Sequence, residues 1–191
     1  MKFALIKERK SPPDRRVVFS PEVAKELQET FSQAQIVAES SDIRVFQNQT
    51  YTDNGIPVLS DVSDADVFLG VKEVPVEALI PNKKYFFFSH TIKKQPHNRK
   101  LLKAILEKNI ELYDHETIVD AQNRRLIGFG YYAGLVGAYN AFRAFGIKFE
   151  LFNLPKAENL SDKESLVQAI KKHTLPPIKI VLTGGEGKVA R

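Results

Sequence analysis

One histidine stands at the end of an unusually aromatic run. Residues 84–90 read KYFFFSH, so four aromatic side chains in a row precede Ser89 and His90. Such a run is typical of a buried strand, which would deliver His90 to the edge of the sheet where the strand leaves the core. A histidine gains or loses a proton near neutral pH with little perturbation, so His90 is a candidate general acid or base. The alternative is that His90 only caps a loop.

Two further apolar runs also end in ionisable residues. Lys72 and Glu73 follow VFLGV, and His115 and Glu116 follow ELYD. The carboxyl ends of parallel strands lie along one edge, with neighbours about 5 Å apart, and would bring these residues to one crevice. A lysine among other cations can act as a base. Lys72 and Glu73 would point to opposite faces of an extended strand, so we expect at most one of them in a shared pocket. Each residue alone is better explained as a structural surface group, but three such strand ends together favour a site.

Two arginines follow the first predicted strand. Arg15 and Arg16 lie in KSPPDRRVVFSP, and a guanidinium there can hold a carboxylate through two parallel hydrogen bonds. The alternative is a pair of exposed loop residues. The net charge of +5 fits an anionic small molecule or simply a basic surface. The basic residues form no block with interleaved aromatics, so we expect no nucleic-acid partner.

The last apolar run leads into a glycine-rich stretch. In KIVLTGGEGKVAR, the spacing of Gly185, Gly187 and Ala190 fits the dinucleotide motif G-x-G-x-x-G/A. A strand, this turn and the next helix would bind the pyrophosphate of NAD or NADP. The sequence stops at Arg191, before that helix and before the acidic residue expected about 20 positions later. We therefore expect a truncated form of a longer enzyme, or alternatively a flexible tail.

Composition limits the remaining classes. The absence of cysteine excludes disulfides and thiolate metal sites, and we expect no metal. No apolar run approaches the roughly 20 residues that span a bilayer, and the start MKFALIKERK is too short in apolar residues for a signal peptide. We expect a cytoplasmic protein with no membrane partner.

Strands and helices alternate along almost the whole chain. The strands are continuous apolar runs, as expected for a parallel sheet covered on both faces. The predicted fold class is α/β: a doubly wound, mostly parallel, Rossmann-like sheet with helices on both faces. Ser20 and Pro21 mark the start of one helix, and the pair Ser161 and Glu164 predicts a capping box at another. The predicted strands are 3–6, 34–39, 65–74, 84–90, 110–117 and 176–187, and the predicted helices are 20–31, 44–55, 95–109, 128–146 and 161–173.

Three domain segments follow from this pattern. Residues 1–146 are predicted to form a substrate domain, and 147–175 a linker and connecting helix. Residues 176–191 would be the first strand and glycine-rich turn of a truncated NAD(P)-binding domain.

Six stretches, in order along the chain, carry a family resemblance. They resemble the N-terminal substrate domain of the alanine dehydrogenase/transhydrogenase superfamily, and within it the saccharopine dehydrogenase (lysine-forming) and lysine–ketoglutarate reductase branch. SHTIKKQ differs from the YLH-type strand of the alanine branch, which favours the saccharopine side. The stretches are KERKSPPDRRVVFSP (7–21), FLGVKEVP (68–75), YFFFSHTIKKQ (85–95), ELYDHE (111–116), RRLIGFGYYAGLVGAYNA (124–141) and KIVLTGGEGKVA (179–190).

The resemblance implies a role for each candidate residue. Lys72 and His90 would be the proton-transferring pair, and Arg16 would bind a substrate carboxylate. The other implied substrate contacts are Glu73 and Glu116, near the substrate amine, and, less specifically, Lys93 and Gln95. Gly185, Gly187 and Ala190 fall on the family's NAD(P) motif.

The implied reaction is NAD(P)-dependent reductive condensation of lysine with 2-oxoglutarate, or its reverse. Two alternatives stay open: an alanine dehydrogenase-type reaction of pyruvate and ammonia, and a non-enzymatic module that binds an amino or oxo acid. Complete family members are much longer, and a later segment completes their first domain, so we expect the chain alone to be inactive. The expected partner is a small amino acid or 2-oxo acid, and the oligomeric state is left open.

Overall fold

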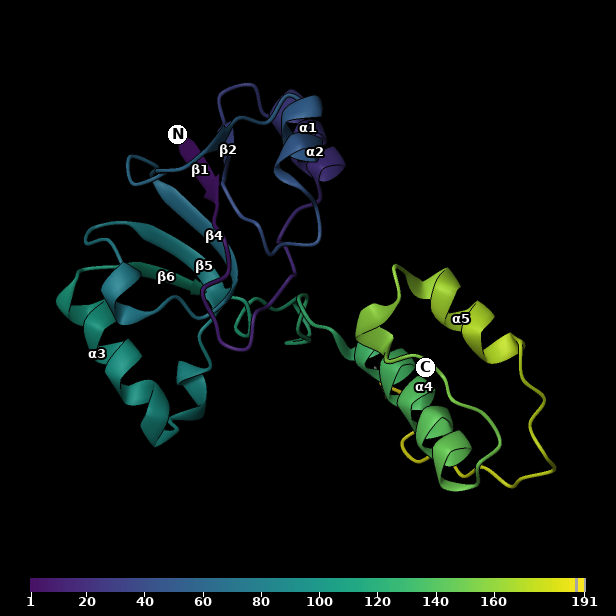
Figure 1. Cartoon of the computed structure of the whole chain (residues 1–191). Helices are drawn as coiled ribbons and strands as arrows, with labels where there is room; N and C mark the ends of the chain where they lie inside the picture. Colours follow the sequence, from purple (N-terminus) through teal and green to yellow (C-terminus); the bar gives the residue numbers. More distant parts are fainter. Residues whose placement is uncertain (188, 191) are drawn as a thin grey trace. The chain divides into compact units, whose positions relative to one another are not determined.

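A six-stranded sheet forms the centre of the N-terminal part of the protein (Figure 1). The strand order is β3-β2-β1-β4-β5-β6, and every neighbouring pair is parallel. This is the order of the doubly wound Rossmann-like fold, so the predicted fold class is confirmed. The strands are β1 (Lys2–Leu5), β2 (Gln35–Glu39), β3 (Val58–Leu59), β4 (Val67–Lys72), β5 (Lys84–Phe88) and β6 (Glu111–Asp114).

The computed structural model describes residues 1–187, 189 and 190. The chain divides into two compact units, Met1–Gly128 and Phe129–Arg191. The helices of the first unit are α1 (Pro21–Thr30), α2 (Asn48–Asp53) and α3 (Arg99–Glu107), with short 3-10 turns η1 (Val76–Ala78), η2 (Thr91–Lys93) and η3 (Pro96–Asn98).

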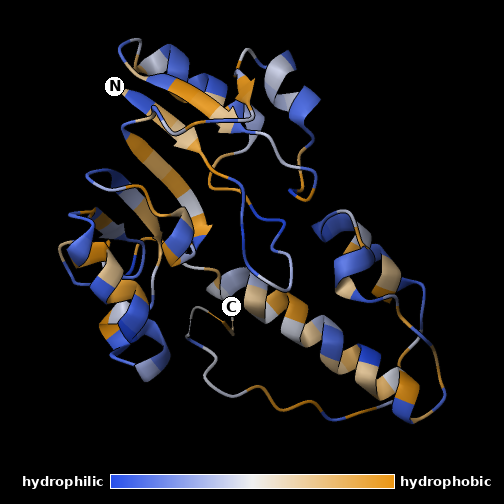
Figure 2. Ribbon diagram, turned by 60° about the vertical axis from the view of Figure 1, so that its left-hand side comes forward, coloured by the Kyte–Doolittle hydropathy of each residue, from blue (hydrophilic) through white to orange (hydrophobic). Residues whose placement is uncertain are grey.

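Helices cover both faces of the sheet. Successive strand residues point to opposite faces, and Ala4 and Leu5 of β1 accordingly belong to different cores. Ala4 shares one core with Leu101 of α3, whereas Leu5 shares the other with Ala24 of α1 and Tyr51 of α2. Figure 1 shows α1 and α2 together on one side of the sheet and α3 on the other. Apolar residues concentrate on the strands between them (Figure 2).

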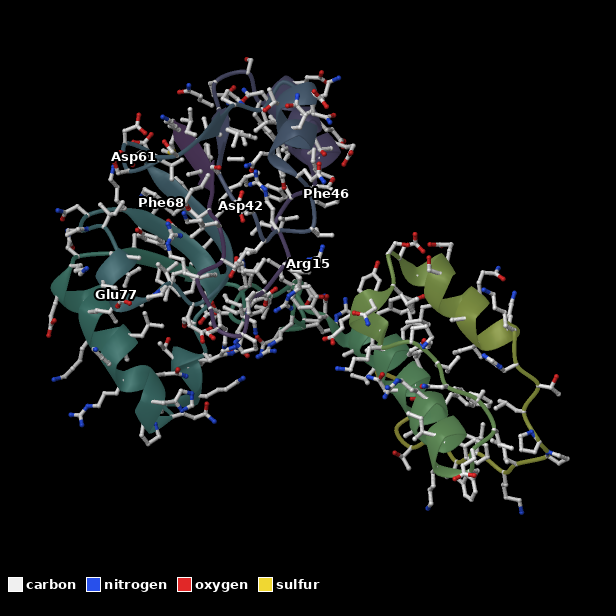
Figure 3. The ribbon with its side chains drawn as sticks, in the orientation of Figure 1. Arg15, Asp42, Phe46, Asp61, Phe68 and Glu77 are labelled. Atoms are coloured by element: carbon white, nitrogen blue, oxygen red, sulfur yellow. The ribbon has the colours of Figure 1, made fainter. Side chains whose placement is uncertain are left out.

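Strand β5 is the buried strand that the aromatic run predicts. Phe87 is fully buried, and the Tyr85 ring stacks on Phe68 of β4 with 4.9 Å between the ring centroids. Phe68 is labelled in Figure 3. Helix α1 begins as predicted, since Ser20 Oγ accepts a hydrogen bond from the Val23 amide at 3.3 Å. Packing of aromatic rings therefore holds β5 in place, and the Ser20 cap fixes the start of α1.

The second unit contains α4 (Gly130–Lys148), η4 (Ala157–Asn159) and α5 (Lys163–Lys171). Tyr139, Leu154 and Leu166 form its small core. The predicted capping box is wrong, because Asp162 caps α5 and its Oδ1 accepts the Ser165 amide at 2.7 Å.

The predicted strand over residues 176–187 is also wrong. These residues form no strand, and the side chains of 180–182 are 63–80% exposed. A strand needs a neighbour for its backbone hydrogen bonds, and the described part of the second unit offers none. Conversely, the two-residue strand β3 was not predicted. No helix among the described residues has the length and apolar character to cross a bilayer.

Candidate functional site

The strand order reverses between β1 and β4, which is where ligands bind in open parallel sheets. Glu8 follows β1 at this point and is buried. Its Oε1 accepts a hydrogen bond from the Val71 amide at 2.7 Å, and its Oε2 accepts one from the Lys72 amide at 2.9 Å. The β4–β5 register shifts just before Lys72, so Glu8 holds backbone that the regular ladder does not. Burial raises the pKa of Glu8, and the two amide bonds offset this only in part.

Arg16 and Asp14 lie close enough to Glu8 for their charges to act on its carboxylate. Arg16 Nε donates to Asp14 Oδ1 at 2.9 Å, and its Nη2 donates to Asp14 Oδ2 at 2.5 Å. The hydrogen bond from Arg16 lowers the pKa of Asp14, and the charge of Lys72 adds to that effect. The two-pronged geometry predicted for a substrate carboxylate is thus formed with Asp14.

Glu73 directly follows Lys72, and the charge of His90 acts on its carboxylate. Glu73 Oε1 accepts a hydrogen bond from Lys10 Nζ at 2.8 Å. Burial raises the pKa of Glu73, but the Lys10 bond and the charge of His90 outweigh burial and lower it. Its Oε2 is buried and has no hydrogen-bond partner among the described residues. Glu73 therefore keeps one acceptor oxygen that a bound donor would satisfy.

Glu116, which follows β6, contacts three basic side chains. Its Oε2 lies 2.9 Å from His90 Nδ1, and its Oε1 lies 3.2 Å from Lys93 Nζ and 2.5 Å from Arg125 Nη2. The Glu116 residue is only 5% exposed. Burial alone would raise the pKa of Glu116, but the bonds from His90, Arg125 and Lys93 lower it to about 2.

The contact with Glu116 favours a hydrogen on Nδ1 of His90. A carboxylate only accepts hydrogen bonds, so Nδ1 must donate to Glu116. In neutral His90, Nε2 is then the acceptor nitrogen. Lys93 Nζ lies 3.3 Å from the same Nδ1 and keeps positive charge beside the ring. Glu116 thus orients the His90 ring and leaves Nε2 as the ring nitrogen that can accept a proton.

The backbone at His90 is unusual. Its φ is 58°, in the left-handed region that residues with a Cβ rarely adopt. Asn98 Nδ2 donates to the His90 carbonyl at 3.1 Å, and the Lys93 amide donates to the same oxygen at 3.2 Å. Backbone in such a conformation persists only where its surroundings hold it, and it is concentrated at functional sites.

Comparison with known proteins agrees with this fold. The family model for the alanine dehydrogenase/PNT N-terminal domain matches residues 4–136. The chain belongs to this family. The predicted resemblance to the superfamily and to its saccharopine dehydrogenase branch is confirmed by the following relatives.

Alpha-aminoadipic semialdehyde synthase, mitochondrial, from Bos taurus is 33% identical over 176 residues, covering 88% of this chain and 19% of the relative. Saccharopine dehydrogenase (NAD(+), L-lysine-forming) from Yarrowia lipolytica is 27% identical over 174 residues, covering 84% and 45% respectively. The solved transhydrogenase from Sinorhizobium meliloti has a TM-score of 0.60 at 17% identity, covering 76% of this chain and 44% of that chain, and so shares the fold. This alanine dehydrogenase/PNT domain thus spans less than half the length of each, and the relatives indicate a domain of the amino-acid dehydrogenase type.

Most of the residues predicted for the site lie in the first unit, within the residues that the family model matches. Lys72 pairs with Phe88 across β4 and β5, and His90 lies two residues beyond Phe88. Gln95 differs from the others: it is exposed, and in the described part of the chain its side chain forms no hydrogen bond. The predicted residues that these bonds and charges connect are Arg16, Lys72, Glu73, His90, Lys93 and Glu116.

Several residues of the group were not predicted from the sequence. Glu8 follows a strand at the reversal point, which is a signal that could have identified it. Arg125 follows Glu116 by nine positions in an irregular segment and offers no such signal. Lys10 and Asp14 lie among many charged residues of one loop. His115 is buried and bonds through Nε2 to the Gly70 carbonyl at 3.0 Å, which is a structural role.

The glycine-rich end of the chain lies in the second unit, beyond residues 4–136 that the family model matches. Gly184 has a φ of 68°, and the Gly187 amide donates to its carbonyl at 2.8 Å, which closes a turn. A Cβ on Gly134 of α4 would meet the Val189 carbonyl oxygen at 1.8 Å, so this end lies against α4. Gly185, Gly187 and Ala190 are thus in a turn that no strand precedes in the described part of the chain. Their role in binding the pyrophosphate of NAD(P) stays a prediction.

Proposed function

We propose that this chain is the substrate-binding and proton-transferring domain of an NAD(P)-dependent amino-acid oxidoreductase acting on CH–NH bonds. The proposed reaction is the condensation of lysine with 2-oxoglutarate, or its reverse. The supporting observation is the 2.9 Å contact of His90 Nδ1 with Glu116, which leaves Nε2 to accept a proton. The printed names of the two sequence relatives support the substrate class.

The charges along the strand ends suit a dicarboxylic oxo acid. Arg16 is proposed to bind one carboxylate, and Lys93 beside Glu116 to attract the other. Lys72 and His90 are proposed to transfer protons as the amine adds to the carbonyl and water leaves. Because Lys72 and His90 both lie at the carboxyl edge of the sheet, one reactant can contact both side chains.

The amine side of the reaction is assigned to Glu73. Its buried Oε2 has no hydrogen-bond partner in the described part of the chain, and its pKa is lowered. A lowered pKa keeps the carboxylate charged, so an ammonium group from the substrate would both satisfy Oε2 and balance its charge.

NAD or NADP would supply the hydride of the complete reaction. Gly185, Gly187 and Ala190 stay its predicted contacts, and the roles proposed for the other residues of this chain do not depend on it. The proposal for this chain therefore concerns binding and proton transfer, and we do not expect turnover from it alone.

Isothermal titration of the chain with 2-oxoglutarate and with pyruvate tests the substrate class. We expect 2-oxoglutarate to bind about tenfold more tightly, because its second carboxylate adds at least one charge-assisted hydrogen bond. Arg16→Gln should weaken 2-oxoglutarate binding by about tenfold or more for the same reason.

The neighbouring arginine provides a matched control. Arg15 is exposed in the loop between β1 and α1 (Figure 3), and Arg15→Gln should leave the affinity within about twofold. Equal affinities for pyruvate and 2-oxoglutarate would favour the alanine dehydrogenase-type alternative. Equal losses from the two arginine variants would remove Arg16 from the site.

A further inference from the structure

A buried carboxylate joins the two loops that carry His90 and Glu116. Asp114 is the last residue of β6 and is 6% exposed. Its Oδ2 accepts a hydrogen bond from Ser89 Oγ, and its Oδ1 accepts one from the Glu116 amide at 2.8 Å. Because Ser89 directly precedes His90, one side chain fixes both the loop after β5 and the turn after β6.

The hydrogen atoms of this network have one consistent arrangement. A carboxylate only accepts, so the Ser89 hydroxyl donates to Asp114. Ser89 Oγ in turn accepts the Thr91 amide at 3.1 Å and lies 2.8 Å from the Thr91 hydroxyl, which must then be the donor. The residues on both sides of His90 are therefore tied to Asp114.

Charge pairing does not explain the carboxylate at this position. Within the described residues, no basic side chain forms an ion pair with Asp114, and its two bonds come from a hydroxyl and an amide. Its separate oxygens instead match donors from two different loops. The left-handed backbone of His90 makes such a restraint necessary, because this conformation is not favoured on its own.

We propose that Asp114 is a positioning residue for His90: it sets the Nδ1–Glu116 contact and with it the tautomer that leaves Nε2 as the proton acceptor. Asp114 acts through His90 and Glu116 and does not itself touch the substrate. The catalytic meaning of this tautomer rests on the proposed function, whereas the tautomer itself can be observed without any ligand.

The variant Asp114→Asn tests the proposal with little change in size. An amide offers one acceptor oxygen, so a donor would face either Ser89 or the Glu116 amide. Two-bond ¹⁵N–¹H spectra of the full chain at about pH 8.5, where imidazoles are mostly neutral, report the tautomer. We expect the Nδ1–H form of His90 in the unchanged chain and a mixture of tautomers in the variant. His115 supplies a reference for the opposite form, since its Nε2 bonds to the Gly70 carbonyl.

Two further variants make the result specific. Asp61 forms the same two-residue turn, with Oδ1 accepting the Ser63 amide at 2.8 Å, and Asp61→Asn should leave the His90 tautomer unchanged. Ser89→Ala removes the other end of the network and should shift the tautomer in the same direction as Asp114→Asn. It also decides the question if Asp114→Asn does not fold. An unchanged Nδ1–H form in the folded variants would overturn the proposal.

Binding of 2-oxoglutarate gives a second readout. Asp114→Asn should weaken it by about fivefold, the equivalent of one lost hydrogen bond. In a His90→Gln background the same change should have less than about a twofold effect, because coupled residues are not additive. Equal losses in both backgrounds would contradict an action through His90. If the unchanged chain does not bind 2-oxoglutarate, the proposed function fails, and the tautomer still decides the role of Asp114.

Discussion

Two buried glutamates hold the site edge, and their environments shift their pKa values in opposite directions. Both residues have little exposed surface, 9% for Glu8 and 5% for Glu116. Glu8 accepts two backbone amides, and its pKa is raised. Glu116 accepts from three basic side chains, and its pKa is lowered to about 2. Burial outweighs the amide bonds at Glu8, whereas the three basic partners outweigh burial at Glu116.

The two glutamates have different partners at the carboxyl edge of the sheet, and therefore different structural roles. Glu8 fixes a backbone, at the irregular point of β4 that carries Lys72. Glu116 fixes side chains, among them the proposed base His90. If this distinction holds, changes at the two glutamates should alter the pH dependence of stability with opposite signs.

The largest effect is expected from Glu116→Gln. Gln cannot balance the charges of Lys93 and Arg125, which both lie beside the same oxygen of Glu116. We expect the free energy of unfolding at pH 7, measured with urea, to fall by about 2 kcal/mol. This is less than the roughly 3–5 kcal/mol for breaking a fully buried pair, because the basic partners are partly exposed.

The pH dependence of Glu116→Gln follows from the lowered pKa. The unfolded chain binds a proton at Glu116 near pH 4.5, and the folded chain binds it only near pH 2. The stability that Glu116 contributes is therefore present above pH 4.5 and lost as the pH falls toward 2. The variant should show a flatter acid limb. Glu111→Gln is the control: it removes an exposed ion pair with Lys84 at the start of β6 and should change stability little. An equal effect there would contradict the prediction.

A smaller effect of mixed sign is expected from Glu8→Gln. The amide can accept only one of the two backbone N–H groups, which should cost about 1 kcal/mol at acid pH. At neutral pH, however, the variant avoids the cost of burying a charge. Because the folded pKa of Glu8 is raised, its contribution falls as the pH rises from 4.5 through that raised value.

Urea unfolding at several pH values checks this opposite sign. Relative to the unchanged chain, Glu8→Gln should look better at pH 7 than at acid pH, whereas Glu116→Gln should look worse. The same sign for both variants would show that Glu8 and Glu116 are not distinguished by their partners.

The sequence predicts most of the sheet and the part of the site that strand ends define. Lys72, His90 and Glu116 were predicted because apolar runs that end in ionisable residues follow a general rule for parallel sheets. Glu8 was not predicted, because a charged pair after a strand is usually solvated. Its role depends on the irregular register of β4 and β5, which no local pattern encodes.

The errors in the second unit have a related cause. The run KIVL is as apolar as the true strands, but in the described part of the chain no strand lies beside it for pairing. Likewise, Ser161 and Asp162 are both good helix caps, and only the local backbone selects Asp162. Composition gives the tendency of a segment, and its neighbours decide the outcome.

The smallest expected effect confines a perturbation to the Glu8 side. A Cβ on Gly70 would lie 3.0 Å from Ile6 Cδ1 and 3.6 Å from Glu8 Oε1. Ile6 must yield by a few tenths of an ångström, so Gly70→Ala should lower the free energy of unfolding by about 0.5 kcal/mol. In ¹⁵N–¹H spectra, the Val71 and Lys72 amides should shift.

The His90 tautomer should stay unchanged in the same variant, since Glu116 and its partners lie on other strand ends. Gly128→Ala is the matched control, because a Cβ there meets no heavy atom within 4 Å. A tautomer change in Gly70→Ala would mean that the two glutamates hold one continuous network, because strain at the backbone of β4 would then have reached the side chains around Glu116.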